Sequence, residues 1–179
     1  MVTTRDRRPD LLTRAQDDFV AAWGKMGSAW GISRTMAEAH ALLYITGEPM
    51  CTDEIMDRLQ ISRGNASMSL RALVDWGVVS RTHRRGDRKE YFVAEQDVWA
   101  MFRAIVRERM RREVAPLLAS LYEIRDLTPD ARGPSIAEHN RRLDAMLGFL
   151  RTADRLSQRF VSPAGQGLRL AASVLNKVS

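Results

Sequence analysis

Residues 52–93 read TDEIMDRLQISRGNASMSLRALVDWGVVSRTHRRGDRKEYFV, and this stretch decides the fold. It contains two short helical patterns that are separated by a turn at Gln60 and Ile61. An arginine-rich segment between two β-type runs follows them. This order predicts a winged helix-turn-helix, a unit that places its second helix in the major groove of DNA.

The helix starts and stops in this stretch are marked by residue type. The first helix is expected to begin at Thr52, whose hydroxyl suits an N-cap, with Asp53 and Glu54 where the helix dipole favours negative charge. Ser62 is the expected N-cap of the second helix. Gly77 is its expected stop, because glycine adopts the left-handed conformation at little cost. Apolar residues at helical spacing predict the buried faces: Ile55, Met56, Leu59, Ala66, Leu70, Leu73 and Val74.

The second helix leaves a polar face exposed in its N-terminal half. In a helix-turn-helix these early residues contact base edges. Arginine can bond guanine through two hydrogen bonds and asparagine can do so to adenine, while small residues allow a close approach. The predicted DNA contacts are Ser62, Arg63, Gly64, Asn65, Ser67, Met68 and Arg71, together with Thr52 on the first helix.

The β-type runs at 78–82 and 91–93 predict a hairpin, the wing, with a short strand at 50–51 beside it. Gly86 and Asp87 form its turn signal. The tip is so dense in positive charge that it would repel itself without an anion, and phosphate is the natural one. Arg84, Arg85, Arg88 and Lys89 are predicted to contact the DNA backbone or the minor groove, and Arg81 is a further predicted DNA contact.

The distribution of charge agrees with this interpretation. The formal net charge of the 179-residue chain is +6. Residues 62–89 carry seven Lys/Arg and two Asp, giving +5, whereas residues 32–61 carry two Arg and five Asp/Glu, giving −3. A solvated charge run is the alternative, but the basic segment coincides with the predicted base-reading positions, as in a nucleic-acid binder.

Helical patterns also precede the reading unit. The N-terminal helix of the chain is expected to begin at Asp10 or Thr13 and to end at Gly31. Its apolar residues recur at alternating three- and four-residue steps, which is typical of a helix that packs on another helix, often from a partner chain. Thr35 and Glu38 fit a capping box at the start of the next helix.

After the wing, Asp97 is expected to cap a long helix that ends near residue 126. Pro116 lies inside it, and because proline removes a backbone hydrogen bond we expect a kink or a break there. Residues 128–134 form a linker. Ser135 and Glu138 then fit a second capping box.

The fold class is therefore mainly α with a small β-hairpin, a winged helix-turn-helix domain flanked by dimerisation helices. We expect an N-terminal dimerisation helix at residues 1–32, the DNA-binding domain at 33–96 and a C-terminal helical dimerisation region at 97–179. A short amphipathic helix at 168–178 is expected to end the chain.

Several classes of protein do not fit. The single cysteine, Cys51, cannot form an internal disulfide, which suits a reducing compartment. The charged N-terminus is not followed by an apolar segment, and no apolar run is long enough to span a bilayer. We expect a cytoplasmic protein with no membrane contact.

Catalytic and metal chemistry also lack a pattern. His40, His83 and His139 lie in three separate elements without a nucleophile motif, and no glycine-rich phosphate loop occurs, so we expect no enzyme and no cofactor. His40 with Cys51 would supply only two metal ligands. A partly exposed structural histidine and a buried structural cysteine are expected instead, since a redox cysteine needs a lowered pKa.

Five motifs carry a resemblance to a known family: GEP at 47–49, ISRGNASMSLRAL at 61–73, WGVV at 76–79, GDRKEYF at 86–92 and DVWAMF at 97–102. Together they resemble the MarR superfamily of bacterial transcriptional regulators, and look closest to its GbsR-like branch. The resemblance covers roughly residues 20–125; beyond 126 only helical character matches. It implies a homodimer that binds operator DNA and usually represses.

The resemblance also implies a response to small ligands, and the GbsR-like branch is associated with osmolytes such as choline and glycine betaine. A quaternary ammonium group is bound by an aromatic cage. Packing in the core or at a dimer seam is the alternative for such rings. The candidates are Trp23, Trp30, Tyr44 and Trp99, with Trp76 as a further ring.

A winged helix can instead bind protein or structured RNA. A protein-binding surface more often carries exposed aromatic or aliphatic anchors. The face formed by Arg63, Asn65, Ser67 and Arg71 is polar, which favours double-stranded DNA.

Overall fold

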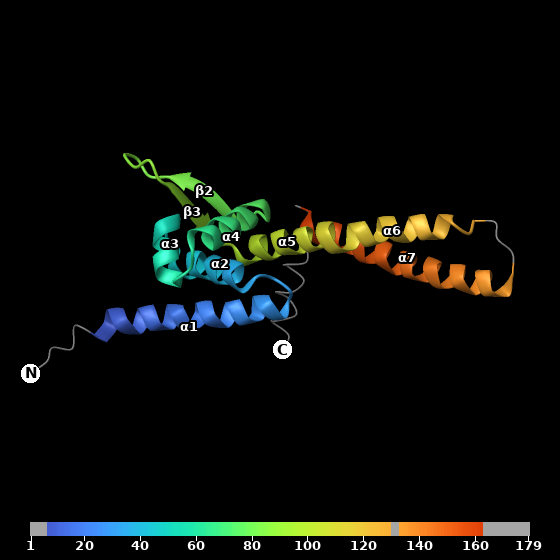
Figure 1. Cartoon of the computed structure of the whole chain (residues 1–179), viewed down its shortest axis with the longest axis horizontal. Helices are drawn as coiled ribbons and strands as arrows, with labels where there is room; N and C mark the ends of the chain where they lie inside the picture. The colour runs from blue at the N-terminus through green and yellow to red at the C-terminus, as the bar shows by residue number, and fades with distance from the viewer. Residues whose placement is uncertain (1–6, 130–132, 163–179) are drawn as a thin grey trace, which may run out of the picture. The chain divides into compact units, whose positions relative to one another are not determined.

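The computed structural model describes residues 7–129 and 133–162 (Figure 1). The chain is mainly helical with one small antiparallel sheet, which confirms the predicted fold class. It divides into two compact units, the first ending at Met101 and the second beginning at Phe102.

The first unit contains the winged helix-turn-helix and the helix that precedes it. Its elements are α1 (Arg7–Ala29), α2 (Arg34–Thr46), β1 (Met50–Cys51), α3 (Thr52–Leu59), α4 (Arg63–Asp75), β2 (Val79–His83), β3 (Glu90–Ala94) and the start of α5 (Val98–Arg109).

The core of this unit is centred on α2. Leu42 and Leu43 of α2 are fully covered, together with Ile55 of α3, Leu70 of α4 and Val78. Burying such side chains contributes roughly 1.5–3 kcal/mol each to folding, before the entropy cost of ordering them. The apolar faces predicted for the helix pair therefore point into one core, and the opposite face of α4 is exposed.

Helix α1 packs along α2 of the same chain, and begins earlier than predicted. Its first helical residue is Arg7 rather than Asp10 or Thr13. It ends at Ala29, and Gly31 follows in the left-handed conformation with φ of 74°, which confirms the predicted stop.

The three strands pair in the order β1-β3-β2, all antiparallel. Arg81 of β2 and Met50 of β1 both lie opposite Phe92 of β3. The predicted strand beside the wing is confirmed. Strand β2 is shifted by one residue relative to the predicted run at 78–82, and β3 extends the run at 91–93 by one residue at each end.

Two helix caps differ from their predictions. The capping box expected at 35–38 does not form, because α2 begins at Arg34, which bonds the carboxylate of position 38 at 2.7 Å. Helix α3 does begin at Thr52, but its cap position is Cys51, whose N–H donates to Glu54 Oε2 at 2.6 Å. Strand β1 runs directly into α3, so the last strand residue takes the place of the cap.

The second unit continues the chain as the rest of α5, a π-helical turn η1 (Met110–Val114), α6 (Ala115–Asp126) and α7 (Pro134–Val161). Asp97 caps α5 as predicted, accepting from the N–H of Trp99 at 2.8 Å. The interruption predicted at Pro116 is η1, which ends at Val114, two residues before that proline. A wider turn accommodates the missing N–H without ending the helix.

Helix α7 also starts differently from the prediction. Its first residue is Pro134, preceded by Gly133 with φ of 137°. Glu138 accepts from Arg141 at 2.7 Å rather than reaching back toward Ser135, so the second capping box is absent. The short helix expected at 168–178 lies outside the described residues.

Helices α6 and α7 lie side by side (Figure 1). Arg125 Nε contacts Asp144 Oδ1 at 2.9 Å, and the Thr128 hydroxyl donates to Asn140 at 2.7 Å. Many large apolar side chains of this pair remain more than 40% exposed: Leu117, Tyr122, Ile124, Leu127, Met146, Phe149 and Leu156.

Candidate nucleic-acid interface

Helix α4 is positioned by a tight turn and a side-chain cap. Gln60 ends α3 in the left-handed conformation with φ of 53°, and the N–H of Ile61 donates to the Met56 carbonyl at 3.2 Å. The Ser62 hydroxyl accepts from the N–H of Asn65 at 3.3 Å, which confirms the predicted N-cap. Gly77 follows α4 with φ of 71°.

The outer face of α4 contains the residues predicted to contact bases. Met68 is 63% exposed, and a single apolar side chain of this kind suits a thymine methyl group. Thr52, at the start of α3, is half-buried. The other predicted α4 positions are exposed: Ser62, Arg63, Gly64, Asn65, Ser67 and Arg71.

The wing tip is folded by its own side chains. The N–H of Asp87 donates to the Arg84 carbonyl at 3.1 Å, and Gly86 has a φ of 86°. The Asp87 carboxylate accepts from the Tyr91 hydroxyl at 2.7 Å and from the Lys89 N–H at 2.9 Å. The bond from the Tyr91 hydroxyl, and then that from the Lys89 N–H, hold the pKa of Asp87 below its usual value. The hydrogen bond between Tyr91 and Asp87 also raises the pKa of Tyr91.

Some of the predicted wing cations contact other groups of the protein, and others make no such contact with the described residues. Arg84 donates to the Pro49 carbonyl at 2.8 Å, and its guanidinium lies 4.3 Å from the centre of the Tyr91 ring. Arg81 pairs with Glu90 at 3.5 Å across the hairpin. Arg85 and Arg88 are exposed and, within the described part of the chain, make no ion pair or side-chain hydrogen bond.

An acidic residue, which the sequence had suggested only as a helix-dipole partner, lies among these cations. Asp53 of α3 contacts Arg63 of α4 at 2.7 Å and Lys89 of the wing at 3.4 Å. The hydrogen bond from Arg63 is the main reason that the pKa of Asp53 is lowered. These residues are too far apart in sequence for any local pattern to indicate the contact.

The aromatic residues considered as a ligand cage are only partly brought together. Trp23 and Tyr44 each contact both Phe19 and His40, with ring centres 5.8–6.4 Å apart, so the four rings pack between α1 and α2. Trp30 is 52% exposed. Trp76 and Trp99 are half-buried.

His40 differs from its prediction. It is buried, only 4% exposed, rather than partly exposed, because α1 covers it. Burial lowers its pKa from 6.5 to about 4. Its Nε2 has no hydrogen-bond partner among the described residues. Cys51 is buried as predicted.

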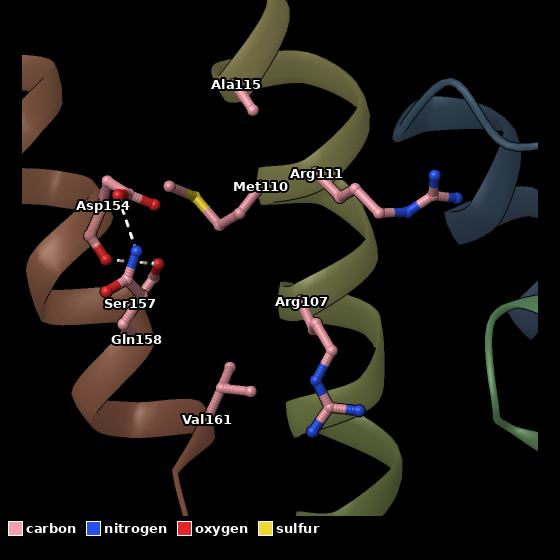
Figure 2. Close-up of a pocket in the computed structure, with 8 residues that line it drawn as sticks. All are labelled: Arg107, Met110, Arg111, Ala115, Asp154, Ser157, Gln158 and Val161. Carbon is pink, nitrogen blue, oxygen red and sulfur yellow. Dashed lines mark hydrogen bonds between the residues drawn. The ribbon is translucent and has the colours of Figure 1, made fainter.

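A small cavity of about 190 Å³ lies in the second unit (Figure 2). Asp154, Ser157 and Gln158 of α7 line one side and Met110 of η1 the other, and Gln158 donates to Asp154 at 2.8 Å. Arg111 extends away from this group, toward a salt bridge with Glu108 at 2.6 Å. None of the aromatic candidates is among the lining residues.

Two further observations concern other classes of site. Across residues 7–129 and 133–162, no three His, Cys, Asp or Glu side chains gather as metal ligands would. Over the same ranges, the helices lack the combination of length and apolar character that crossing a bilayer requires.

Comparison with known proteins shows that this chain is similar to transcriptional regulators. Residues 30–90 match the sequence model of the MarR family. The HTH-type transcriptional repressor GbsR of Bacillus subtilis (strain 168) is 29% identical over 120 residues, which are 66% of each protein, just under two thirds. The HTH-type transcriptional repressor OpcR of the same organism is 21% identical over 83% of this chain and 84% of its own. These relatives are transcriptional regulators rather than enzymes.

One solved structure supports the fold. The crystal structure of a transcriptional regulator superimposes with a TM-score of 0.66 and 22% identity, over 85% of this chain and 99% of that chain. At this identity the likeness concerns the fold alone.

Proposed function

We propose that the protein is a cytoplasmic transcriptional repressor that binds operator DNA as a homodimer. The premise is that residues 30–90 of this chain belong to the MarR family. One observation carries the proposal. The exposed face of α4 is polar and basic, and the same unit presents a wing in which Arg85 and Arg88 make no ion pair with any residue that the structure describes. This combination provides both base readout and phosphate contacts.

The roles follow from the chemistry of each side chain. Arg63, Asn65 and Arg71 would bond base edges in the major groove, while the small residues beside them allow close approach. Arg85 and Arg88 would bind phosphate most readily, since they need not leave a partner among residues 7–129 and 133–162. The remaining proposed contacts are Thr52, Ser62, Gly64, Ser67, Met68, Arg81, Arg84 and Lys89.

A homodimer accounts for the apolar surface of the second unit. Leu127 is 79% exposed and Phe149 67%, and a second copy that covered such side chains would remove them from water. Two copies would then place their α4 helices in successive major grooves about 34 Å apart, on a pseudo-palindromic site.

Selection of bound duplexes from random and genomic DNA tests this function. We expect an enriched two-fold symmetric site that binds at least about a thousandfold more tightly than random duplex. Sedimentation should show a dimer at micromolar concentration. Equal binding to every duplex would contradict operator recognition. It would favour the alternative, a winged-helix module that binds protein or RNA.

Response to a small ligand stays a prediction. A ligand can release the operator only if it has different affinities for two conformations of the dimer. Repeating the selection with choline and glycine betaine tests it, because only an effector would change the affinity for the enriched site.

A further inference from the structure

The Asp53 carboxylate occupies the junction of the three elements proposed to face DNA. Its Oδ1 contacts Nη2 of Arg63 on α4, and its Oδ2 contacts Nζ of Lys89 at the wing, at 2.7 and 3.4 Å. Each carboxylate oxygen therefore binds one cation. A phosphate group offers its oxygens to arginine and lysine in a similar way.

Fold stability is a poor explanation for these contacts. The side chains of Asp53, Arg63 and Lys89 are 46%, 71% and 55% exposed. Exposed ion pairs contribute little to folding, because solvent and salt screen them and because ordering the side chains costs entropy. A function at the DNA surface accounts better for a carboxylate that takes two cations at once.

We propose that Asp53 is a built-in anion that competes with DNA phosphates for Arg63 and Lys89, and thereby lowers the affinity for random DNA more than the affinity for the operator. This inference rests on the proposed function. It makes Asp53 a specificity-determining residue that need not contact any base.

The hydrogen-bonding capacity of arginine explains the discrimination. Asp53 takes only Nη2 of Arg63, so the other guanidinium N–H groups remain available. A guanine edge carries no net charge, and Arg63 can bond it while keeping Asp53. A phosphate on Arg63 would instead lie beside a carboxylate of the same sign, which disfavours that contact.

The test is Asp53→Asn in the full-length chain, which keeps the shape of the side chain and removes its charge. Affinity is measured for random duplex and for the enriched site over a series of salt concentrations. We expect random-duplex affinity to rise about three- to tenfold, with a salt slope steeper by about one to two units, as freed cations bind phosphate. Operator affinity should rise less.

Asp57→Asn is the matched control. Asp57 lies on the same helix, α3, is exposed and makes no ion pair within the described part of the chain, so this variant changes the net charge equally. It should raise both affinities slightly and to the same extent. The double variant D53N/K89Q should lose part of the gain in random-duplex affinity, because one of the freed cations is then absent.

Different results overturn different claims. If D53N and D57N behave alike, or if D53N weakens operator binding alone, Asp53 is not a competitor and the inference is wrong. If the wild-type chain binds all duplexes equally, operator recognition fails, while the comparison of D53N with D57N on random duplex still decides the role of Asp53. If neither the wild-type chain nor D53N binds DNA, both proposals fail.

Discussion

Gly27 of α1 approaches Ala37 of α2 so closely that a β-carbon at position 27 would lie 2.5 Å from the Ala37 β-carbon. Ala37 is 5% exposed, and its β-carbon is fixed to the backbone, so it cannot rotate away. The α1–α2 contact therefore requires glycine for backbone approach. In a neighbouring position, a β-carbon on Gly24 would meet the flexible side chain of Glu38.

Gly27→Ala should destabilise the first unit by about 1–3 kcal/mol, because the added methyl group forces the two helices apart. Helix propensity alone predicts the opposite sign, a gain of about 0.5–1 kcal/mol. Urea unfolding followed by circular dichroism gives the sign. Gly64→Ala is the control for stability, since nothing lies within 4 Å of its added β-carbon. A Gly27→Ala variant that unfolds later than wild type contradicts the tight contact.

Stability should fall in acid because of His40. Its folded-state pKa is about 4, below the 6.5 of an exposed histidine, since burial penalises the charged ring. Between these values the unfolded chain binds a proton that the folded chain does not. The free energy of unfolding therefore decreases as the pH falls from 6.5 to 4, by up to about 3 kcal/mol from this group.

The measurement is the urea midpoint at pH 7, 6, 5 and 4 for wild type and for His40→Leu. The variant should lose much of the dependence in this window, whatever its stability at pH 7. Replacing His139, which is exposed on α7, should leave the dependence unchanged. An equal slope in wild type and His40→Leu would show that other groups control acid stability.

Much of the reading unit was predictable because its signals are local. The Ser62 cap, the Gly77 stop and the apolar faces depend on residues within one or two turns of each other. The capping boxes failed for a related reason. Glu38 and Glu138 each found an arginine three or four residues away on the same helix, and the sequence pattern does not rank the two partners.

The contacts between elements were not predictable. Asp53 meets Lys89 only because β1 leads directly into α3 and places that helix beside the wing. His40 is buried because α1 covers α2, whereas its position in the sequence suits partial exposure equally well. Local pattern indicates which face of a helix is polar, and the tertiary arrangement decides which residues another element covers or pairs.

Asn65→Ala should reduce affinity for the enriched site by about 1–3 kcal/mol and leave random duplex unchanged. The substitution keeps the N-cap of α4, because the Ser62 hydroxyl accepts from the backbone N–H of residue 65, which alanine also has. Competition binding with duplexes altered at single positions should also show relaxed preference at one base pair. Equal losses on both kinds of duplex would assign Asn65 to the phosphate backbone.

Arg85→Ala should weaken binding to every duplex and make the salt slope shallower by about one unit. Arg85 makes no ion pair within the described residues, so its removal leaves no unpaired acid in the wing and the whole effect falls on DNA. Arg14→Ala is the charge-matched control, because Arg14 is exposed on α1, and Figure 1 shows that this helix lies away from the β2–β3 hairpin. A salt slope that changes equally in both variants would mean that net charge alone, and not a phosphate contact at the wing tip, accounts for the loss.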